Sequence, residues 1–249
     1  MNHMKKVVLI TGASAGMGKE TAALLVKNGY TVYGAARRAD KMKDLEKLGV
    51  KILEMDVTDD ESVVKGVNQI ISSEKQIDIL VNNAGTDGKN ADFWDITEED
   101  YDAVLNLNLK GVFFATQTLV QHLLETKRKG KIVNISSVHE ELPFPHFTSY
   151  CASKGGVKMM MRNLAIELGP LGININNVAP GAIETPINKN LLNDPQKLAA
   201  LLQNIPLGRL GKPSDIAPLV AFLASSDADY ITGATFFADG GLLWNYHEQ

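Results

Sequence analysis

The sequence has a single cysteine among its 249 residues, no long apolar run and no excess of positive charge. With Cys151 alone the chain cannot form an internal disulfide, which favours a reducing compartment and predicts a cytoplasmic protein. The apolar run near the N-terminus extends only from Val7 to Ile10, and no window approaches the roughly 20 apolar residues that a membrane-spanning helix needs. A formal net charge of −4 argues against nucleic acid or an anionic membrane as the main partner.

Short apolar runs alternate with amphipathic segments along almost the whole chain. The apolar runs are rich in valine and isoleucine, which is typical of strands that are buried on both faces. The predicted strands cover residues 6–11, 30–36, 50–56, 77–83, 130–136, 172–180 and 234–240. The predicted helices cover residues 17–28, 40–48, 59–73, 98–125, 149–169 and 213–225.

The repeated order of strand, helix and strand predicts right-handed crossovers and a seven-stranded parallel sheet with helices on both faces. This is the α/β, doubly wound Rossmann-type fold. No linker, charge block or repeat interrupts the alternation, so we predict a single domain over residues 1–249. Residues 181–209 are an exception, because their strand character is weak. We predict that residues 183–210 form a substrate-binding lid over the carboxyl edge of the sheet, where ligands bind in such folds.

Three glycines, Gly12, Gly16 and Gly18, lie between the first predicted strand and the first predicted helix, in the stretch TGASAGMG. Glycine permits a tight turn and lets backbone N–H groups approach a phosphate at a helix N-terminus. A P-loop needs four residues between its glycines and then Lys-Ser/Thr, whereas five residues separate Gly12 from Gly18 and Lys19-Glu20 follow. The P-loop is therefore excluded, and a dinucleotide site is favoured over a plain structural turn.

The end of the second predicted strand indicates which dinucleotide binds. An acidic residue there would bind the ribose 2′-hydroxyl of NAD, and an arginine suits the 2′-phosphate of NADP. The chain has Ala35-Ala36 at this place, directly followed by Arg37 and Arg38. A solvated basic pair is the plainer alternative. We predict a preference for NADP, with NAD possible as a cofactor.

Four further motifs follow the glycine turn in order: MDVTD (55–59), NNAG (82–85), NLNLKG (106–111) and SS…YCASK (136–154). Together they resemble the short-chain dehydrogenase/reductase family, and the resemblance covers the whole chain. It implies a nicotinamide cofactor and hydride transfer between that cofactor and a secondary alcohol or carbonyl.

Tyr150 and Lys154 stand four residues apart, so on a helix their side chains share one face. A phenol titrates near pH ~10 in water, and a nearby ammonium or an oxidised nicotinamide favours the phenolate and lowers this pKa. Tyr150 can then act as a general base or acid toward the substrate hydroxyl. Ser137 ends a strand beside this helix and can hydrogen-bond the substrate oxygen.

The family resemblance implies the same roles and adds others. It places Lys154 on the nicotinamide ribose and gives Asn108 a proton-relay water, although Asn108 could instead simply distort a helix. Ser137 is preferred to Ser136 because it stands thirteen residues before Tyr150, the usual family spacing. The predicted catalytic residues are Ser137, Tyr150, Lys154 and Asn108. The predicted cofactor contacts are Gly12, Ser14, Gly16, Met17, Gly18, Arg37, Arg38, Asp56, Val57, Asn83, Ala84, Gly85, Tyr150, Lys154, Pro180, Gly181, Ile183 and Thr185. The five histidines show no metal-ligand spacing, and no metal is predicted.

The second half of the chain resembles bacterial glucose 1-dehydrogenases within the family, in stretches such as SSVHE, NNVAPGAIETPIN and FADGG. In that group the histidine after the catalytic serine helps to bind the sugar, and it matches His139; a histidine that orders the loop is the alternative. His139 and Glu140 offer hydrogen-bonding groups to a polyol. The first half instead resembles NADP-preferring carbonyl and steroid reductases, and Asp87 stands where the glucose enzymes carry a glutamate. The predicted substrate contacts are Ser137, His139, Asp87 and Tyr150.

Three functions therefore remain open. The first is an NADP-preferring sugar or polyol dehydrogenase of the glucose 1-dehydrogenase type. The second is a carbonyl reductase of the 3-oxoacyl or ketosteroid type. The third is a dinucleotide-sensing protein without turnover, which the intact Ser137, Tyr150 and Lys154 disfavour. The leucines of the predicted lid discriminate between the sugar dehydrogenase and the carbonyl reductase, because they face either an apolar substrate or the sheet. These leucines are Leu191, Leu192, Leu198, Leu201 and Leu202.

The resemblance also implies an assembly. Small members of the family usually form homotetramers through paired long helices, here predicted at 98–125 and 149–169, with the terminal strand region as another contact. Both segments carry more apolar residues than one buried face requires, as in VFFATQTLV and VKMMM. We expect a homotetramer that binds a small-molecule substrate.

Overall fold

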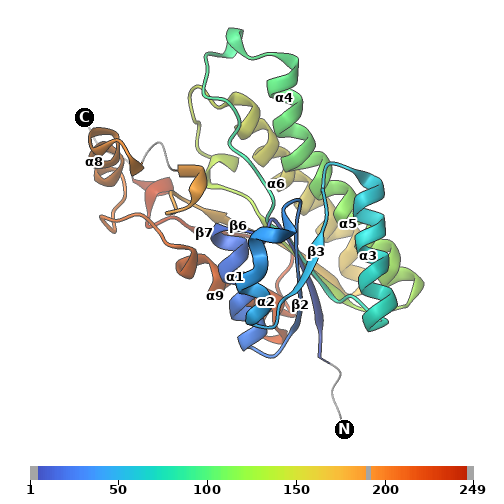
Figure 1. Cartoon of the computed structure of the whole chain (residues 1–249). Coiled ribbons are helices and arrows are strands. Elements are labelled where there is room, and N and C mark those ends of the chain that lie inside the picture. The colour runs from blue at the N-terminus through green and yellow to red at the C-terminus, as the bar shows by residue number, and fades with distance from the viewer. Residues whose placement is uncertain (1–4, 189–191, 246–249) are drawn as a thin grey trace.

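The computed structural model describes residues 5–188 and 192–245, so the prediction made for Leu191 lies outside the described residues. One sheet of seven parallel strands forms the centre of the molecule, in the order β3-β2-β1-β4-β5-β6-β7 (Figure 1). The strands are β1 Val7–Thr11, β2 Thr31–Ala36, β3 Lys51–Glu54, β4 Ile79–Asn82, β5 Gly130–Ile135, β6 Ile173–Pro180 and β7 Thr235–Ala238. The predicted doubly wound parallel fold is confirmed.

Helices cover both faces of this sheet. The α-helices are α1 Gly16–Lys27, α2 Lys43–Lys47, α3 Asp60–Glu74, α4 Glu98–Leu105, α5 Gly111–Glu125, α6 Thr148–Leu168, α8 Pro195–Gln203 and α9 Pro213–Ala224. Short 3-10 turns are Ala39–Met42, Phe93–Asp95, Val138–Glu140, Gly169–Leu171, Pro186–Asn188, Ser226–Ala228 and Leu242–Trp244. Within the described ranges, every helix is too short or too polar to cross a membrane.

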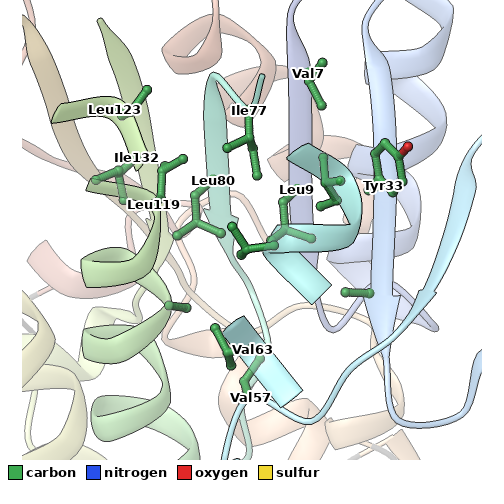
Figure 2. Close-up of a cluster of buried hydrophobic side chains, with 14 of the residues drawn as sticks. Val7, Leu9, Tyr33, Val57, Val63, Ile77, Leu80, Leu119, Leu123 and Ile132 are labelled. Atoms are coloured by element: carbon green, nitrogen blue, oxygen red, sulfur yellow. The ribbon is translucent and has the colours of Figure 1, made fainter. Parts of the chain in front are cut away.

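Two apolar cores result from the alternation of side chains along the buried strands. In β1, Leu9 belongs to the core that lies under α3, α5 and α6, and Ile10 belongs to the core that lies under α1, α2 and α9 on the opposite face. Figure 2 shows part of the first core, with Leu80 of β4 and Ile132 of β5 beside Leu119 of α5. Each such side chain contributes about 1.5–3 kcal/mol of transfer free energy, which anchors the helices firmly to the sheet.

The strand order reverses between β1 and β4, because β2 and β3 lie on one side of β1 and the later strands on the other. In a doubly wound sheet this switch point opens a crevice at the carboxyl ends of the strands, where ligands bind. The ends of β1 and β4 are joined here by hydrogen bonds. The Thr11 hydroxyl accepts from the N–H groups of Asn83 (3.0 Å) and Ala84 (3.1 Å), and the Asn83 amide donates to the Thr11 carbonyl (2.9 Å).

A ladder of buried polar side chains crosses the sheet just below this edge. Asn82, Asn134 and Asn177 are register partners on β4, β5 and β6, and Thr235 pairs with Asn177 from β7. The Asn82 amide donates to Asn134 (2.9 Å), and the Asn134 amide donates to Asn177 (3.0 Å). The Asn177 amide donates to a carboxylate oxygen of Glu140 (3.2 Å). Because polar groups inside a sheet destabilise it unless they are hydrogen-bonded, these contacts are needed for the buried strands to pack.

Two predicted segments differ from the structure. The single helix predicted over residues 98–125 is divided into α4 and α5 by a π-helical turn, Asn106–Lys110. The stretch 181–209, for which no helix was predicted, contains α8. Both differences arise around the candidate site. Asp59 caps α3 with its side chain, and Gly29 follows α1 with a φ of +89°.

Candidate active site

The glycine turn after β1 leaves the N-terminus of α1 open. Gly12 and Gly16 have φ of +67° and +55°, in the left-handed region that favours glycine. A Cβ at Gly12 would lie 2.7 Å from the Ala84 backbone. The N-cap residue Ala15 offers no side chain to the first-turn N–H groups, and that turn holds no acidic residue. Free N–H groups and the positive end of the helix dipole therefore face one place, an arrangement that fits a phosphate.

Arg37 and Arg38 follow β2 and line the same cleft as the glycine turn. Asp56 lies beyond β3 and accepts hydrogen bonds from the Thr58 N–H (2.9 Å) and hydroxyl (2.7 Å). Burial opposes the charge of Asp56, but these hydrogen bonds and the nearby Arg37 together lower its pKa. The far end of the cleft therefore carries two guanidinium groups and one fixed carboxylate, a donor and acceptor set that fits a nucleoside bearing a phosphate.

The cleft has a volume of about 270 Å³ and gathers most of the predicted cofactor contacts. The predicted residues that line it are Gly12, Ser14, Gly16, Met17, Arg37, Arg38, Asp56, Val57, Asn83, Ala84, Gly85 and Thr185. Further lining residues that the sequence argument missed are Ala15, Ala36, Met55, Leu107, Pro186 and Ile187. Each missed residue is next in the sequence to a predicted contact or lies in or beside one of the quoted motifs. Its position in the sequence was therefore the signal that could have identified it as a lining residue.

Six predicted cofactor residues are not part of this lining, and two of them, Tyr150 and Lys154, belong to the group described below. Gly18 has a packing role, because a Cβ there would lie 2.3 Å from the Asn83 amide nitrogen. Pro180 is the last residue of β6, and a Cβ at Gly181 would lie 2.8 Å from Asp239 Cα. Ile183 is buried at 3% exposure and faces the second core. These positions shape the walls behind the cleft.

Asn108 lies in the π-helical turn and is buried at 1% exposure. Its side-chain oxygen accepts from the Thr86 N–H (2.9 Å), and its amide donates to the Thr86 carbonyl (2.7 Å) and the Ser153 hydroxyl (3.1 Å). Asn108 thus joins the loop after β4 to α6. The π turn carries the residue inward to make these contacts, as such turns often do at functional sites.

Ser137, Tyr150 and Lys154 converge where β5 ends and α6 begins. Ser137 precedes the Val138–Glu140 turn, and its hydroxyl hydrogen-bonds Tyr150 and accepts from the His139 N–H (3.2 Å). Lys154 Nζ donates to the Ile135 carbonyl (2.9 Å) and lies 5.6 Å from the centroid of the Tyr150 ring. A Cβ at Gly85 would lie 3.8 Å from Lys154 Nζ, so the cleft and this group of residues meet at Gly85.

Burial dominates the titration of this group. Burial raises the pKa of Tyr150 to about 12, with the Asp87 charge adding to it and the hydrogen bond from Ser137 opposing it. Burial lowers the pKa of Lys154 to about 8, and the Glu140 carboxylate opposes that change. The expectation that Lys154 lowers the phenol pKa is wrong for the chain by itself, because both charged forms are desolvated.

His139 lies edge-on to Tyr150, with ring centroids 6.1 Å apart, and stacks on Phe144 at 4.2 Å. Its Nδ1 is 3.0 Å from the Leu142 carbonyl. A carbonyl can only accept, so Nδ1 carries the proton. Burial lowers the pKa of His139, against the hydrogen bond to Leu142, so the ring is neutral at pH 7 and Nε2 is an acceptor.

Asp87 and Glu140, which the sequence argument also offered to the substrate, lie in different surroundings. Asp87 is partly buried; burial raises its pKa, against hydrogen bonds from backbone N–H groups, and its charge acts on Tyr150. The sequence argument offered Glu140 to a polyol, and that placement is wrong. Glu140 is buried, and its two oxygens accept from Thr235 (2.7 Å) and Asn177 (3.2 Å) inside the protein.

The segment after β6 passes over the cleft. Thr185, Pro186 and Ile187 line the cleft, and α8 follows at the margin of the molecule in Figure 1. No residue of α8 is buried, and its leucines are only partly covered.

The family model for Enoyl-(Acyl carrier protein) reductase matches residues 12–243, which is most of the chain. The glycine turn, the open α1 N-terminus and the group of Ser137, Tyr150 and Lys154 all lie within this match. The chain belongs to the short-chain dehydrogenase/reductase family. It is an oxidoreductase that acts on CH–OH or carbonyl groups with a nicotinamide cofactor.

Its curated relatives act on different substrates, as their names state. The chain is 41% identical to the 3-oxoacyl-[acyl-carrier-protein] reductase FabG of Thermotoga maritima, over 96% of this chain and 98% of the relative. It is 38% identical to the 3beta-hydroxysteroid dehydrogenase 1 of Eggerthella lenta, over 95% and 93%. It is also 38% identical to the glucose 1-dehydrogenase of Gluconobacter oxydans, over 95% and 91%.

Solved structures of similar chains contain either cofactor. The 3-ketoacyl-(acyl-carrier-protein) reductase from Brucella melitensis, complexed with NADH, superposes with a TM-score of 0.89 at 32% identity, over 97% of this chain and all of the other. A chain from Agrobacterium tumefaciens with bound NADP superposes with a TM-score of 0.88 at 38% identity, over 98% and 99%. The family therefore supports a nicotinamide cofactor without deciding between the two.

The buried ammonium of Lys154 predicts a pH-dependent stability. Between pH 8 and the ordinary lysine pKa of about 10.5, the unfolded chain holds a proton that the folded chain has released, so raising the pH stabilises the fold. The free energy of unfolding of the wild-type protein, relative to a Lys154→Met variant, should rise by up to about 3 kcal/mol across this window. Urea unfolding at a series of pH values measures it. A constant difference between the two proteins would contradict a buried ammonium at this position.

Proposed function

We propose that the protein is an NADP-preferring dehydrogenase of a sugar or other polyol, of the glucose 1-dehydrogenase type. The observation that carries this proposal is the polar surroundings of Tyr150, where the neutral ring of His139 lies edge-on to the phenol and the charge of Asp87 acts on it. A polyhydroxylated substrate has hydroxyl donors for both acceptors.

The cofactor would be held by groups along the cleft at the sheet edge. The open N-terminus of α1 suits the pyrophosphate, and Arg37 and Arg38 suit a 2′-phosphate. Lys154, beside Gly85, would bind the nicotinamide ribose. When bound, the oxidised nicotinamide accepts hydride from the substrate carbon and adds a positive charge that favours the Tyr150 phenolate.

Tyr150 is the proton carrier in this proposal. With its pKa raised to about 12, the phenol holds its proton at neutral pH and is ready to donate it to a carbonyl oxygen. In the oxidation direction it would accept the hydroxyl proton, helped by the hydrogen bond from Ser137 and by the positive charge of the oxidised nicotinamide. The hydrogen bonds of Asn108 join α6 to the loop that follows β4, and this link holds the cleft beside the phenol.

A second candidate is a carbonyl reductase of the 3-oxoacyl or ketosteroid type. The observation that favours it is α8 in the proposed lid, residues 183–210, because the helix buries none of its side chains. Leu198, Leu201 and Leu202 are only partly covered and could lie against an acyl chain or a steroid. The FabG and hydroxysteroid dehydrogenase relatives support the same alternative.

The homotetramer implied by the family is supported by apolar side chains on the two expected helices. Phe113 of α5 and Met159 and Ile166 of α6 are exposed, the last at 78%. Trp244, beyond β7, is exposed as well. Contact with another copy would remove these surfaces from water.

A substrate panel tests the proposed function. Absorbance at 340 nm, the reduced-nicotinamide band, is followed with NADP and with NAD against aldoses, polyols, hydroxysteroids and oxoesters. We expect NADP-dependent oxidation of an aldose, glucose first. Absence of sugar oxidation together with rapid reduction of an oxoester would reject the first function in favour of the second.

The cofactor preference depends on Arg37 in this account. Arg37→Ala removes a charge-assisted hydrogen bond worth about 1.5–3 kcal/mol, so kcat/KM for NADP should fall by roughly 10- to 100-fold while the value for NAD changes little. Lys41→Ala serves as the control, because Lys41 is exposed and does not line the cleft. A variant that keeps its full preference for NADP would contradict the role of Arg37.

A further inference from the structure

Glu140 is a buried carboxylate placed directly after the catalytic serine turn. It is 8% exposed, and its N–H donates to the Ser137 carbonyl (3.0 Å). Its side chain turns into the sheet, where Oε1 accepts from the Thr235 hydroxyl (2.7 Å) and Oε2 accepts from the Asn177 amide (3.2 Å). The turn that carries Ser137 is thereby tied to β6 and β7.

The carboxylate also sets the direction of the polar ladder. Each amide of the ladder donates toward Glu140, from Asn82 to Asn134, from Asn134 to Asn177, and from Asn177 to Glu140. An ionised carboxylate can only accept hydrogen bonds, so a ladder that ends on it has one direction. An amide at this position could donate as well as accept, and this direction would no longer be fixed.

A buried charge needs more than two neutral donors, because desolvation costs several kcal/mol even after relaxation. The group of opposite charge is Lys154, which is itself buried at 6% exposure and bound to the Ile135 carbonyl. The Val138–Glu140 turn packs against α6, which carries Lys154. The negative charge of Glu140 raises the pKa of Lys154, against the burial that lowers it.

The other groups around Lys154 do not supply such a charge. Tyr150, on the same helix, keeps its proton because burial raises its pKa. His139, edge-on to Tyr150, is neutral because burial lowers its pKa. Asp87, from the loop after β4, acts on Tyr150. Within the described part of the chain, Glu140 is the charged group that acts on Lys154.

We propose that Glu140 is a positioning residue of the active site: its carboxylate, fixed by Asn177 and Thr235, is the buried counter-charge to Lys154 and holds the Ser137 turn against the sheet. The proposal rests on the catalytic role of Lys154 in the proposed function, and it is independent of which alcohol or carbonyl is the substrate.

The test is the titration of Lys154 in the cofactor-free protein. With lysine labelled by ¹³C at Cε, the Lys154 resonance is the one absent from Lys154→Arg. In Glu140→Gln, which keeps the size of the side chain, this resonance should titrate about one pH unit or more lower than in the wild type. Glu141→Gln is the matched control, because Glu141 pairs with Lys158 instead. An unchanged Lys154 titration in folded Glu140→Gln would overturn the proposal.

Kinetics separate this role from a merely structural one. The alkaline limb of the pH profile of kcat/KM for carbonyl reduction, where the ammonium is lost, should move to lower pH in Glu140→Gln. Glu140→Asp keeps the charge and should return the limb toward its wild-type position. A uniform loss of activity in Glu140→Gln, with no movement of the limb, would reject the electrostatic role.

A matched pair of shorter side chains applies if Glu140→Gln does not fold. Glu140→Asp keeps the negative charge, and Glu140→Asn removes it from a side chain of the same size. The Lys154 resonance should therefore titrate at lower pH in Glu140→Asn than in Glu140→Asp. Equal titration in both proteins would overturn the proposal. Because no cofactor or substrate is present, neither result depends on the proposed activity.

Discussion

Parallel pairing of all seven strands is the constraint on which the rest of the structure depends. It brings the carboxyl ends of β1, β4, β5 and β6 to one edge, although these strands lie far apart in the sequence. The glycine turn, the NNAG stretch and the segment around Thr185 therefore meet at the reversal between β1 and β4, and Lys154 lies beside Gly85 of this cleft. Two apolar cores hold the helices that present these segments, so the geometry of the site follows from the packing of the sheet.

The site is built from groups that a folded protein buries only at a cost. Lys154 and Glu140 are both buried charges, and the ladder from Asn82 to Asn177 places amides inside a sheet. Each of these groups is hydrogen-bonded to another part of the protein, and the ladder connects the Ser137 turn to β4 through β7. Low dielectric around Tyr150 and Lys154 strengthens every charge that acts on them. The same burial that weakens the fold thus makes the phenol responsive to its charged neighbours.

Local sequence patterns predicted the sheet, the order of its elements, the glycine turn and the Arg37-Arg38 pair, because strand ends place their neighbouring residues directly. The family resemblance supplied the other predicted contacts of the cleft, such as Asp56 and Asn83. Glu140 was misplaced for a geometric reason: a 3-10 turn has three residues per turn, so consecutive side chains point about 120° apart and His139 and Glu140 face different surroundings. The π turn at Asn108 was missed because the periodicity of 98–125 fits one helix, and the break serves contacts with Thr86 and Ser153 that sequence does not show. The pKa values of Tyr150 and Lys154 depend on burial, which spacing along a helix does not reveal.

The central claim is that the Tyr150 hydroxyl carries the proton in the reaction, and Tyr150→Phe tests it most directly. The variant keeps the ring that packs against His139 and removes only the hydroxyl, with Tyr230→Phe as a control on an exposed tyrosine. We expect kcat on the best substrate of the panel to fall by about 10²- to 10⁴-fold while the cofactor still binds, as followed by the fluorescence of the reduced nicotinamide. Turnover by Tyr150→Phe at the wild-type rate would contradict the account.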